Sequence, residues 1–501
     1  MWNCKFFGII CTHIDTIDGV RKYWLVFSTL SLLLISVCSC NFPVSTPTGK
    51  PNPGLVPNNS SPTSTPFFPS EPTAITPSPA ALTSTPPSPS LTPTFSFGTW
   101  PPPYFGNPGP AQVTAIPIAF PPLSGKETVN FLLVGSDRRA LSFRTDTLVV
   151  VSFRPRDQSV SMISIPRDLY VYIPGWKMQR INTAYQQGEL TSYPGGGAQL
   201  LKDTVEYNLG IHIDHIAMVE FNGFSQIIDT LGGIDVPLVC AFTDWHITDP
   251  TKSDQNEDNW ALFTIGPGVV HMDGDLALWY ARSRMRSSDF DRGRRQQEVL
   301  RAIFNQSVRL NVITKLPELY SQLSNTVITD LSLNNLLELA PFAYNLSLPH
   351  IRSYYINKSY VYGWRTPTGA AVLLPNQNAI LHLVAEAMAP PDENETTYWS
   401  TTVEIWNGTH TTNLDVLAAE RLHYTGFETT LSPADDQENA QTFLYDFTPD
   451  QDPHRSAKLL YSLGIPPANL ISSPNPESPS AYRLILGTDF NPCFDPALLI
   501  H

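Results

Sequence analysis

A long proline-rich stretch decides which part of this chain can fold into a packed domain. Between Asn41 and about Ser124 the sequence holds roughly half of the chain's 47 prolines, mixed with serine and threonine, and its only charges are Lys50 and Glu71. Such a composition cannot bury a core and favours an extended chain with polyproline II character. At ~3.1 Å per residue, its roughly 80 residues could reach on the order of 200 Å. We therefore interpret residues 41–125 as a tether that precedes the folded part.

An apolar segment precedes this tether. The basic pair Arg21–Lys22 is followed by an uncharged run, Tyr23–Cys40, whose length of roughly 18 residues lies at the boundary between a signal sequence and a spanning helix. The positive charge on its N-terminal side predicts that the rest of the chain lies outside the cytoplasm. The run also ends like a bacterial lipoprotein cleavage site with Cys40 as the lipidated residue, although the usual leucine is missing. Residues 1–40 are therefore expected to hold the protein at the extracytoplasmic face of the cell membrane, through a transmembrane anchor or a lipid.

Charge and cysteine content exclude some classes of function. The net charge of −14 argues against a general nucleic-acid binder, because affinity for a phosphate backbone needs a basic surface. Outside the N-terminal segment only Cys240 and Cys493 remain, and no CxxC pair occurs, so a cysteine zinc site is not expected. These two cysteines could form a disulfide, but their spacing does not decide it.

From about Glu127 onward, short runs rich in β-branched residues alternate with helical patterns. This alternation indicates a layered α/β domain in which loops at strand ends carry the chemistry. A linker is expected at 390–395, so we predict a catalytic domain over 126–390 and a small α/β domain over 400–491. The expected strands are 129–134, 147–153, 160–165, 216–220, 351–356, 402–406 and 482–486, and the expected helices are 195–209, 221–231, 274–282, 292–305, 316–323, 333–346, 413–424 and 455–463.

Carboxylates and arginines stand at the ends of the first three predicted strands. Asp137 follows the first strand, Arg144 and Asp146 introduce the second, and Arg167 follows the third. Asp137 and Asp146 suit a hard divalent cation such as Mg²⁺, which binds a few carboxylates together with phosphate oxygens of a substrate. An adjacent arginine would neutralise charge that develops on a transferring phosphoryl group. One such group alone would be an ordinary turn, but three together favour a site.

The stretch from Ala277 to Arg301 is rich in arginine and contains no lysine. A guanidinium grips phosphate oxygens with a planar fork of donors, so this composition favours oriented phosphate recognition over general surface charge. A solvated helix face with local salt bridges is the alternative. The absence of lysine and the apolar residues at the start of the stretch favour arginines that face a cleft. The arginines are Arg282, Arg284, Arg286, Arg292, Arg294, Arg295 and Arg301.

Together these motifs resemble the LytR-CpsA-Psr family of bacterial cell-envelope phosphotransferases. The resemblance covers about 127–305, in the family's order, through VNFLLVGSDRR, FRTDTLVVVSF, SMISIPRDLYVYIP, INTAYQQG, VEFNGFSQIIDTLGGIDV, YARSR and DFDRGRRQQ. It implies a three-layer α/β/α sandwich with a central mixed sheet and an apolar tunnel for a lipid. The implied reaction moves a teichoic-acid-like, capsular or other wall glycan from an undecaprenyl-pyrophosphate carrier to peptidoglycan, forming a phosphodiester with the help of Mg²⁺.

The resemblance also assigns roles to individual residues. Asp137 and Asp146 match metal-binding carboxylates, and Asp289 matches a carboxylate that would orient an arginine or assist proton removal from the acceptor. The implied catalytic set is Arg144, Arg167, Asp289 and Arg292. The implied pyrophosphate-binding set is Arg144, Arg167, Arg282, Arg284, Arg292, Arg295 and Gln296.

Two features of the chain qualify or extend this assignment. Met285 and Arg286 stand where the family often carries a histidine and an acidic residue, which affects the details of that loop. Near the C-terminus, VEIWNGT and LILGTDF resemble the LytR C-terminal domain, for which we expect a wall-binding or partner-binding role.

Two other functions fit the same residues. A non-catalytic protein could use the arginines to dock an anionic wall polymer, and a polyprenyl pyrophosphate hydrolase would use water in place of the acceptor. Dependence on Mg²⁺ would separate the binder from both enzymes, and transfer to a wall acceptor would separate the two enzymes.

Overall fold

The computed structural model describes residues 116–123, 127–139, 142–247, 249, 251–252, 255–323 and 326–493. The expected anchor at 1–40, with Cys40, and nearly all of the expected tether at 41–125 lie outside the described residues. The chain separates into two units, Met1–Leu91 and Thr92–His501, and every described residue belongs to the second. Within the described ranges, no helix is both long and apolar enough to cross a membrane.

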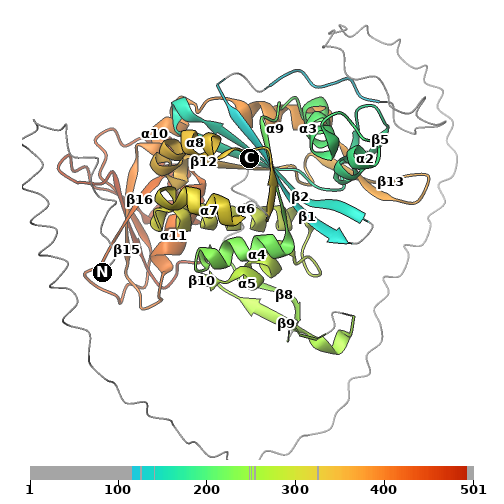
Figure 1. The fold of residues 1–501 in the computed structure, drawn as a ribbon. Coiled ribbons are helices and arrows are strands. Elements are labelled where there is room, and N and C mark those ends of the chain that lie inside the picture. Colours follow the sequence, from blue (N-terminus) through green and yellow to red (C-terminus); the bar gives the residue numbers. More distant parts are fainter. Residues whose placement is uncertain are drawn as a thin grey trace, which may run out of the picture. The chain divides into compact units, whose positions relative to one another are not determined.

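A six-stranded mixed sheet forms the centre of the fold (Figure 1). Its strands are β1 (Val129–Arg139), β2 (Ser142–Arg154), β3 (Ser159–Ser164), β6 (His215–Glu220), β11 (Val327–Thr329) and β12 (Ile351–Tyr355). They lie in the order β11-β6-β1-β2-β3-β12. The pairs β1–β2, β2–β3 and β6–β11 are antiparallel, whereas β1–β6 and β3–β12 are parallel.

Helices cover both faces of this sheet. Because side chains alternate along a strand, Leu132 packs into the core beneath α3 and α9, and its neighbour Phe131 packs into the core beneath α6 and α8. The helices are α3 (Gly196–Leu209), α6 (Asp289–Arg309), α8 (Leu333–Asn345) and α9 (Gln377–Met388). The predicted three-layer α/β/α sandwich with a central mixed sheet is therefore confirmed.

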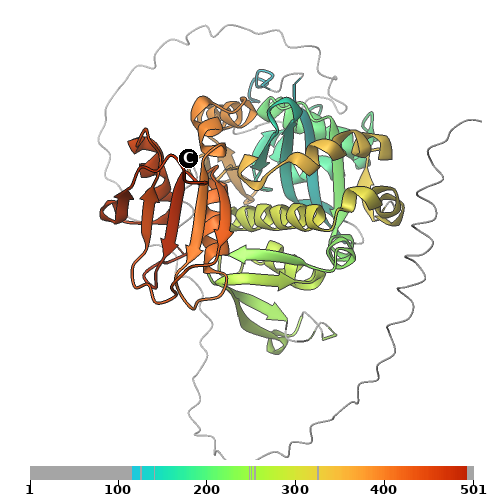
Figure 2. The same ribbon diagram turned by 90° about the vertical axis from the view of Figure 1, so that its left-hand side faces the viewer.

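Smaller elements extend from this core. Figure 2 shows α6 lying between the central sheet and the strands β7 and β10. The additional helices are α2 (Ala184–Leu190), α4 (Phe221–Thr230), α5 (Gly274–Arg282) and α7 (Leu316–Leu323). The additional strands form four antiparallel ribbons: β4 (Tyr170–Tyr172) with β5 (Met178–Arg180), β7 (Ile234–Leu238) with β10 (Gly268–Met272), β8 (Phe242–Ile247) with β9 (Trp260–Ile265), and β13 (Val361–Arg365) with β14 (Ala371–Pro375).

The first two strands are longer than the sequence predicts. They form a hairpin in which β1 extends as far as Arg139 and β2 begins already at Ser142. The register of the pair shifts between Gly135 and Ser136. We expected Asp137 to follow the first strand. It lies instead within β1 and pairs with Arg144 of β2. Polar residues in the outer part of a ribbon give no hydrophobic signal, which explains the error.

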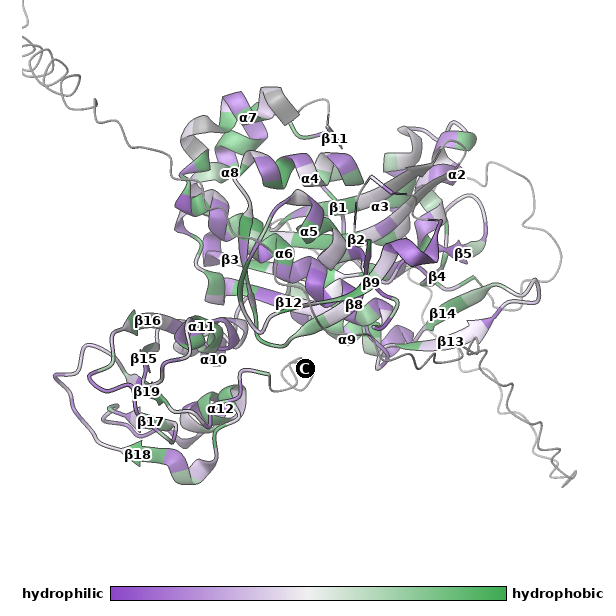
Figure 3. Ribbon diagram, turned by 90° about the horizontal axis from the view of Figure 1, so that it is seen from below, coloured by the Kyte–Doolittle hydropathy of each residue, from purple (hydrophilic) through white to green (hydrophobic). Residues whose placement is uncertain are grey.

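A second sheet lies near the C-terminus, with a core of its own (Figure 3). Its strands are β15 (Thr402–Asn407), β16 (Glu428–Ser432), β17 (Phe443–Asp446), β18 (Leu470–Ser472) and β19 (Tyr482–Leu486), in the order β16-β15-β19-β17-β18. Its helices are α11 (Leu414–Tyr424) and α12 (Pro453–Leu463). The assignment of this region to a LytR C-terminal domain, and the predicted domain bounds, stay predictions.

The predicted linker at 390–395 is wrong in its second half. Helix α10 (Glu393–Trp399) begins there with a capping box, in which Asp392 accepts a hydrogen bond from the backbone N–H of Glu395 and the Glu395 carboxylate accepts one from the backbone N–H of Asp392. Such reciprocal pairing satisfies backbone donors at a helix start, so acidic residues after a proline pair can begin a helix.

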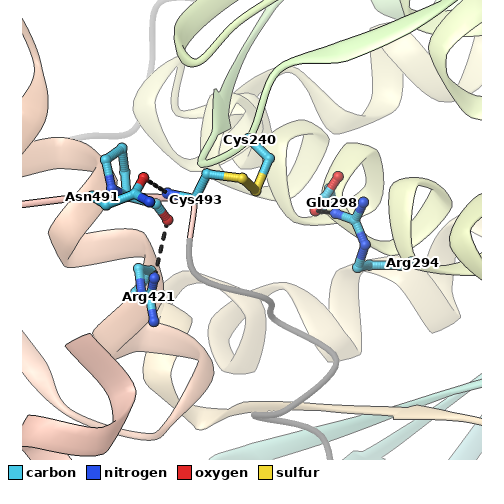
Figure 4. The surroundings of a disulfide bond; sticks show 7 residues. Cys240, Arg294, Glu298, Arg421, Asn491 and Cys493 are labelled. Atoms are coloured by element: carbon cyan, nitrogen blue, oxygen red, sulfur yellow. Dashed lines mark hydrogen bonds and ion pairs between the residues drawn. A yellow bond between two sulfur atoms is a disulfide. The ribbon is translucent and has the colours of Figure 1, made fainter. Parts of the chain in front are cut away.

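Several contacts join the second sheet to the rest of the described chain; Ser347, for example, donates from Oγ to Glu428 Oε1 on β16 at 2.6 Å. Cys240 and Cys493 form a disulfide, with Cα atoms 4.5 Å apart, which settles a pairing that the sequence left open (Figure 4). On α6, the buried Arg301 places Nε 3.4 Å from Oε1 of Glu420 on α11, and its guanidinium lies 4.3 Å from the ring centre of Tyr424. A buried ion pair thus links the helix of the central fold to the second sheet.

We predict that Glu420→Gln lowers the free energy of unfolding by about 3 kcal/mol near neutral pH, because Arg301 would keep a buried charge without its partner. Burial alone would raise the pKa of Glu420, but Arg301 and His423 hold that pKa below its usual value. A carboxyl group with a lowered pKa stabilises the fold above its unfolded-state pKa and loses this contribution as the pH falls. The difference between wild type and variant should therefore shrink below about pH 4.

Urea unfolding at both pH values measures this difference. Glu438→Gln is the matched control, because Glu438 is exposed and pairs only with the exposed His410 among described residues. Equal stability of wild type and Glu420→Gln near neutral pH would contradict the prediction.

Candidate functional site

Charged side chains from three parts of the chain meet at one edge of the central sheet. Asp146 lies near the start of β2, Arg167 follows β3, and Asp289 opens α6. Because β2 and β3 are antiparallel, the start of the former and the end of the latter lie at the same edge. The strand-end motifs predicted that Asp146 and Arg167 would converge, and the family resemblance assigned Asp289 to the same site. The structure brings the three together.

Arg167 is surrounded by three carboxylates. Its Nη1 donates to Oδ1 of Asp146 at 2.7 Å, and its Nε lies 3.6 Å from Asp168 Oδ2 and 3.7 Å from Asp289 Oδ2. Burial alone would lower the pKa of Arg167, but Asp146 and the other two carboxylates raise it above its usual value. The guanidinium is therefore fixed in place as a cation.

Asp289 is the second centre of the cluster. Its Oδ1 lies 3.6 Å from Nη1 of both Arg284 and Arg292. Arg292 is buried and its Nη2 donates to the backbone oxygen of Asp146 at 3.3 Å; burial lowers its pKa, although Asp289 opposes that effect. One carboxylate thus touches three arginines, counting Arg167, and holds them around the same space.

The start of α6 is fixed by a capping box. Ser288 accepts from the backbone N–H of Asp291, and the Asp291 carboxylate accepts from the backbone N–H and the hydroxyl of Ser288. Burial alone would raise the pKa of Asp291, but these hydrogen bonds hold it below its usual value. Asp291 therefore stabilises the helix start, while Asp289, two residues earlier, faces the arginines.

An apolar cavity of about 270 Å³ lies between the central sheet and helices α4, α5 and α6. Arg282 and Gln296 are among its few polar lining residues. The Arg282 guanidinium lies 3.7 Å from the ring centre of Phe221, and Gln296 donates from Nε2 to Thr147 Oγ1 at 2.8 Å. The apolar lining residues include Leu133, Val149, Val219, Phe224, Ile227, Leu278, Val299 and Ile303. This cavity is the candidate for the apolar tunnel that the sequence resemblance implied.

The structure gives Arg295 a different place from the one expected. Its side chain is fully buried and donates to the backbone oxygens of Tyr280 and Ser283, and to Ser287 Oγ at 2.9 Å. These contacts tie the end of α5 to α6. We therefore assign Arg295 a supporting role in place of the predicted direct contact with pyrophosphate.

Two other arginines of this stretch also serve the packing. Arg294 pairs with Glu298 one turn along α6, and Arg301 pairs with Glu420. Of the seven arginines, Arg282, Arg284 and Arg292 are the ones that the structure places beside the cavity or in the cluster around Asp289.

Arg180 is a residue of the cluster that was not predicted from the sequence. Its Nε lies 3.3 Å from Oδ1 of Asp168, and the other oxygen of Asp168 lies 3.6 Å from Nε of Arg167. Asp168 therefore connects Arg180 to the charged cluster. A signal existed, because Arg180 directly precedes the motif INTAYQQG. Nothing in the spacing, however, linked it to the strand ends.

The predicted metal ligands are only partly described. Asp137 and Arg144 pair in the backbone register of β1 and β2, but their side chains lie outside the described part of the structure. Among described residues, no group of three or more His, Cys, Asp or Glu side chains is arranged to hold a metal ion. Mg²⁺ commonly binds one or two carboxylates plus substrate phosphates, so the Asp146 carboxylate, at the centre of the cluster, fits such an ion.

Comparison with known proteins agrees with these motifs. Residues 111–385 match the LytR_cpsA_psr family model. TagU of Oceanobacillus iheyensis, a polyisoprenyl-teichoic acid–peptidoglycan teichoic acid transferase, is 36% identical over 214 residues, which are 42% of this chain and 61% of that protein. TagT of Bacillus subtilis, with the same description, is 30% identical over 228 residues, 44% of this chain and 66% of that protein.

The matched region is thus less than two thirds of the length of either relative. Among solved structures, B. subtilis TagV is 28% identical, with a TM-score of 0.43 over 53% of this chain and 96% of that chain. Because the family model covers more than half of the sequence, the chain belongs to the LytR_cpsA_psr family.

Proposed function

We propose that this protein transfers a glycopolymer from a polyprenyl-pyrophosphate carrier to peptidoglycan and forms a phosphodiester. The observation that carries the proposal is the position of an arginine cluster beside an apolar cavity, with Arg282 in the cavity wall and Arg284 two residues later in the cluster. A donor with an anionic head and an apolar chain needs both environments next to each other. Family membership and the printed names of the relatives support the same reaction.

The arginines would bind and orient the pyrophosphate. Arg167, Arg284 and Arg292 already surround Asp289, so their donors are arranged before a substrate enters. Such preorganisation stabilises charge that develops during phosphoryl transfer without a cost of rearrangement. Arg144 belongs to this proposed set on the basis of the sequence motif, and Gln296 would help to shape the cavity wall through Thr147 and Ala281.

The proposed reaction is an in-line displacement at phosphorus. A sugar hydroxyl of the wall attacks the phosphorus that carries the glycan, a new P–O bond forms, and the bond to the bridging oxygen breaks. The lipid leaves as polyprenyl phosphate, and the hydroxyl proton passes to a carboxylate at the site. Asp289 is our candidate for that acceptor, although orienting three arginines is the role for which its contacts give most support.

A magnesium ion belongs to the proposal through Asp146 and Asp137. When bound, it would supply positive charge to the phosphate oxygens. Arg167 contacts Asp146 at 2.7 Å, so this arginine and the carboxylate would be positioned together.

The cellular location is proposed from the same features. Disulfides persist in oxidising surroundings, and the Cys240–Cys493 bond therefore suits the extracytoplasmic face of the cell membrane. Residues 1–40 would supply the anchor, and the second sheet is proposed to bind the wall or a partner.

We expect product formation by the full chain to require Mg²⁺ and Arg282. The assay combines a polyprenyl-pyrophosphate-linked glycan with peptidoglycan and follows polyprenyl phosphate, with Mg²⁺ or with a chelator. Arg282→Ala should reduce the rate about a hundredfold or more, because a charged donor at the phosphoryl group would be lost. Full activity of this variant would contradict the assignment of Arg282 to the site. Release of lipid phosphate without transfer to peptidoglycan would identify a hydrolase. Binding of the donor without turnover would identify a docking protein.

A second prediction separates binding arginines from packing arginines. Arg295→Met should lower the free energy of unfolding by about 2 kcal/mol, because Tyr280 and Ser283 would lose a charged hydrogen-bond donor in the interior. Arg284→Met should change stability by less than about 0.5 kcal/mol, because its side chain is 46% exposed.

Binding of inorganic pyrophosphate provides the complementary measurement. Arg284→Met should weaken it about tenfold, as expected for the loss of a hydrogen bond to a charged group. A stable Arg295→Met protein that no longer binds pyrophosphate would restore the direct role predicted from the sequence.

A further inference from the structure

The β8–β9 ribbon carries an apolar face that the proposed chemistry does not use. Its antiparallel register places Trp245 opposite Leu262 and Ile247 opposite Trp260. Directly paired residues point to the same side of a ribbon, so these four side chains share one face. Trp245 is 41% exposed and Leu262 is 50% exposed. We call Trp245, Ile247, Trp260 and Leu262 the ribbon face.

The opposite side of the ribbon is fixed to the domain. Phe242 and Phe263 each place their ring centre 5.4 Å from that of Trp279 on α5. The buried Asp244 accepts a hydrogen bond from the backbone N–H of Met285 at 3.0 Å. These contacts are made by the opposite side of the ribbon, so the ribbon face points away from α5. Figure 1 shows β8 and β9 at the periphery of the fold.

A basic and apolar loop lies beside the ribbon. Met285, which Asp244 holds, is 76% exposed, and it is flanked by the exposed Arg284 and Arg286. The same helix that supports the ribbon lines the apolar cavity through Leu278 and Ala281. Exposed apolar side chains and arginines are therefore neighbours on one part of the surface, and α5 connects them to the apolar cavity.

We propose that the ribbon face docks on the surface of a lipid bilayer. Tryptophan is favoured at the boundary between headgroups and acyl chains, and leucine and isoleucine gain free energy there by leaving water. Arg286 would contact lipid phosphate groups, since guanidinium is complementary to phosphate. This inference rests on the proposed function in one respect, because docking matters most for a donor that is itself embedded in the membrane.

Charge at the ribbon tip determines how the docking occurs. The connection between the two strands carries Asp249, Glu257 and Asp258, with Lys252 as its only described cation. Carboxylates avoid an anionic bilayer, so the tip would point along or away from the surface. The ribbon would then lie flat, with its apolar face against the membrane and the cavity close to the donor lipid.

Quenching by brominated lipids tests the contact directly. The full chain is reconstituted in vesicles of phosphatidylcholine and phosphatidylglycerol with brominated acyl chains, which quench only tryptophans that reach the bilayer. We expect Trp245→Phe, which keeps the face apolar, to lower the fraction of fluorescence that is quenched. Trp364→Phe is the matched control, because Trp364 lies on a different ribbon, β13–β14, and its loss should not lower that fraction. Equal quenching in wild type and Trp245→Phe would overturn the proposal.

Turnover provides a second readout that a folding defect cannot imitate. Leu262→Ser should slow turnover of a vesicle-embedded donor several-fold and leave turnover of a short-chain, water-soluble donor unchanged. Leu337→Ser is the control, since Leu337 is 43% exposed on α8 of the central fold, away from the cavity and the charged cluster, and should affect neither donor. An equal loss with both donors would overturn the proposal, as would a dimer in detergent that Leu262→Ser dissociates.

These tests stay separate from the proposed reaction. If wild-type protein turns over neither donor, the proposed function fails, but the quenching comparison still reports whether the ribbon reaches the bilayer.

Discussion

The burial of charge along α6 is the constraint on which the rest of this structure depends. An isolated charge in a protein interior costs several kcal/mol, so each buried arginine needs a partner from another part of the chain. Arg292 pairs with Asp289 and donates to the backbone oxygen of Asp146. Arg295 donates to a backbone oxygen at the end of α5, and Arg301 pairs with Glu420. One helix thereby joins the charged cluster, the cavity wall and the second sheet.

Polar contacts of the same helix also bind the central sheet. Gln297 is fully buried and donates to Ser164 Oγ at 2.8 Å and to the backbone oxygen of Tyr354 at 3.0 Å, which connects it to β3 and β12. Because these are adjacent strands, the helix cannot slide without breaking several buried hydrogen bonds. The geometry around Asp289 is therefore a consequence of packing along the whole length of α6.

Much of the fold could be predicted because its signals are local. The β-branched runs of the central strands indicated a buried sheet, and the helix 274–282 was predicted with the bounds that α5 has. The meeting of Asp146 and Arg167 followed from motifs at strand ends, whereas Asp289 and Arg292 were assigned to the same site by the family resemblance. The short ribbons, whose strands have three to six residues, were not predicted.

The role of individual arginines could not be predicted in the same way. A guanidinium that grips phosphate and one that caps backbone carbonyls present the same donors, so composition could not separate Arg284 from Arg295. The difference comes from tertiary packing, which places the Arg295 side chain where it donates to backbone oxygens at the end of α5 and so joins α5 to α6. Similarly, among the described residues Arg180 reaches the cluster through Asp168, a contact between residues without a shared motif.

The identity of the phosphorus-containing products distinguishes transfer to peptidoglycan from hydrolysis. Phosphorus NMR of a reaction that contains polyprenyl-pyrophosphate-linked glycan and peptidoglycan distinguishes the bonds that form. We expect a new phosphodiester signal on the wall fraction together with an equal amount of polyprenyl monophosphate. A glycan monophosphate with no phosphodiester would show that water is the acceptor, and it would contradict transfer to peptidoglycan.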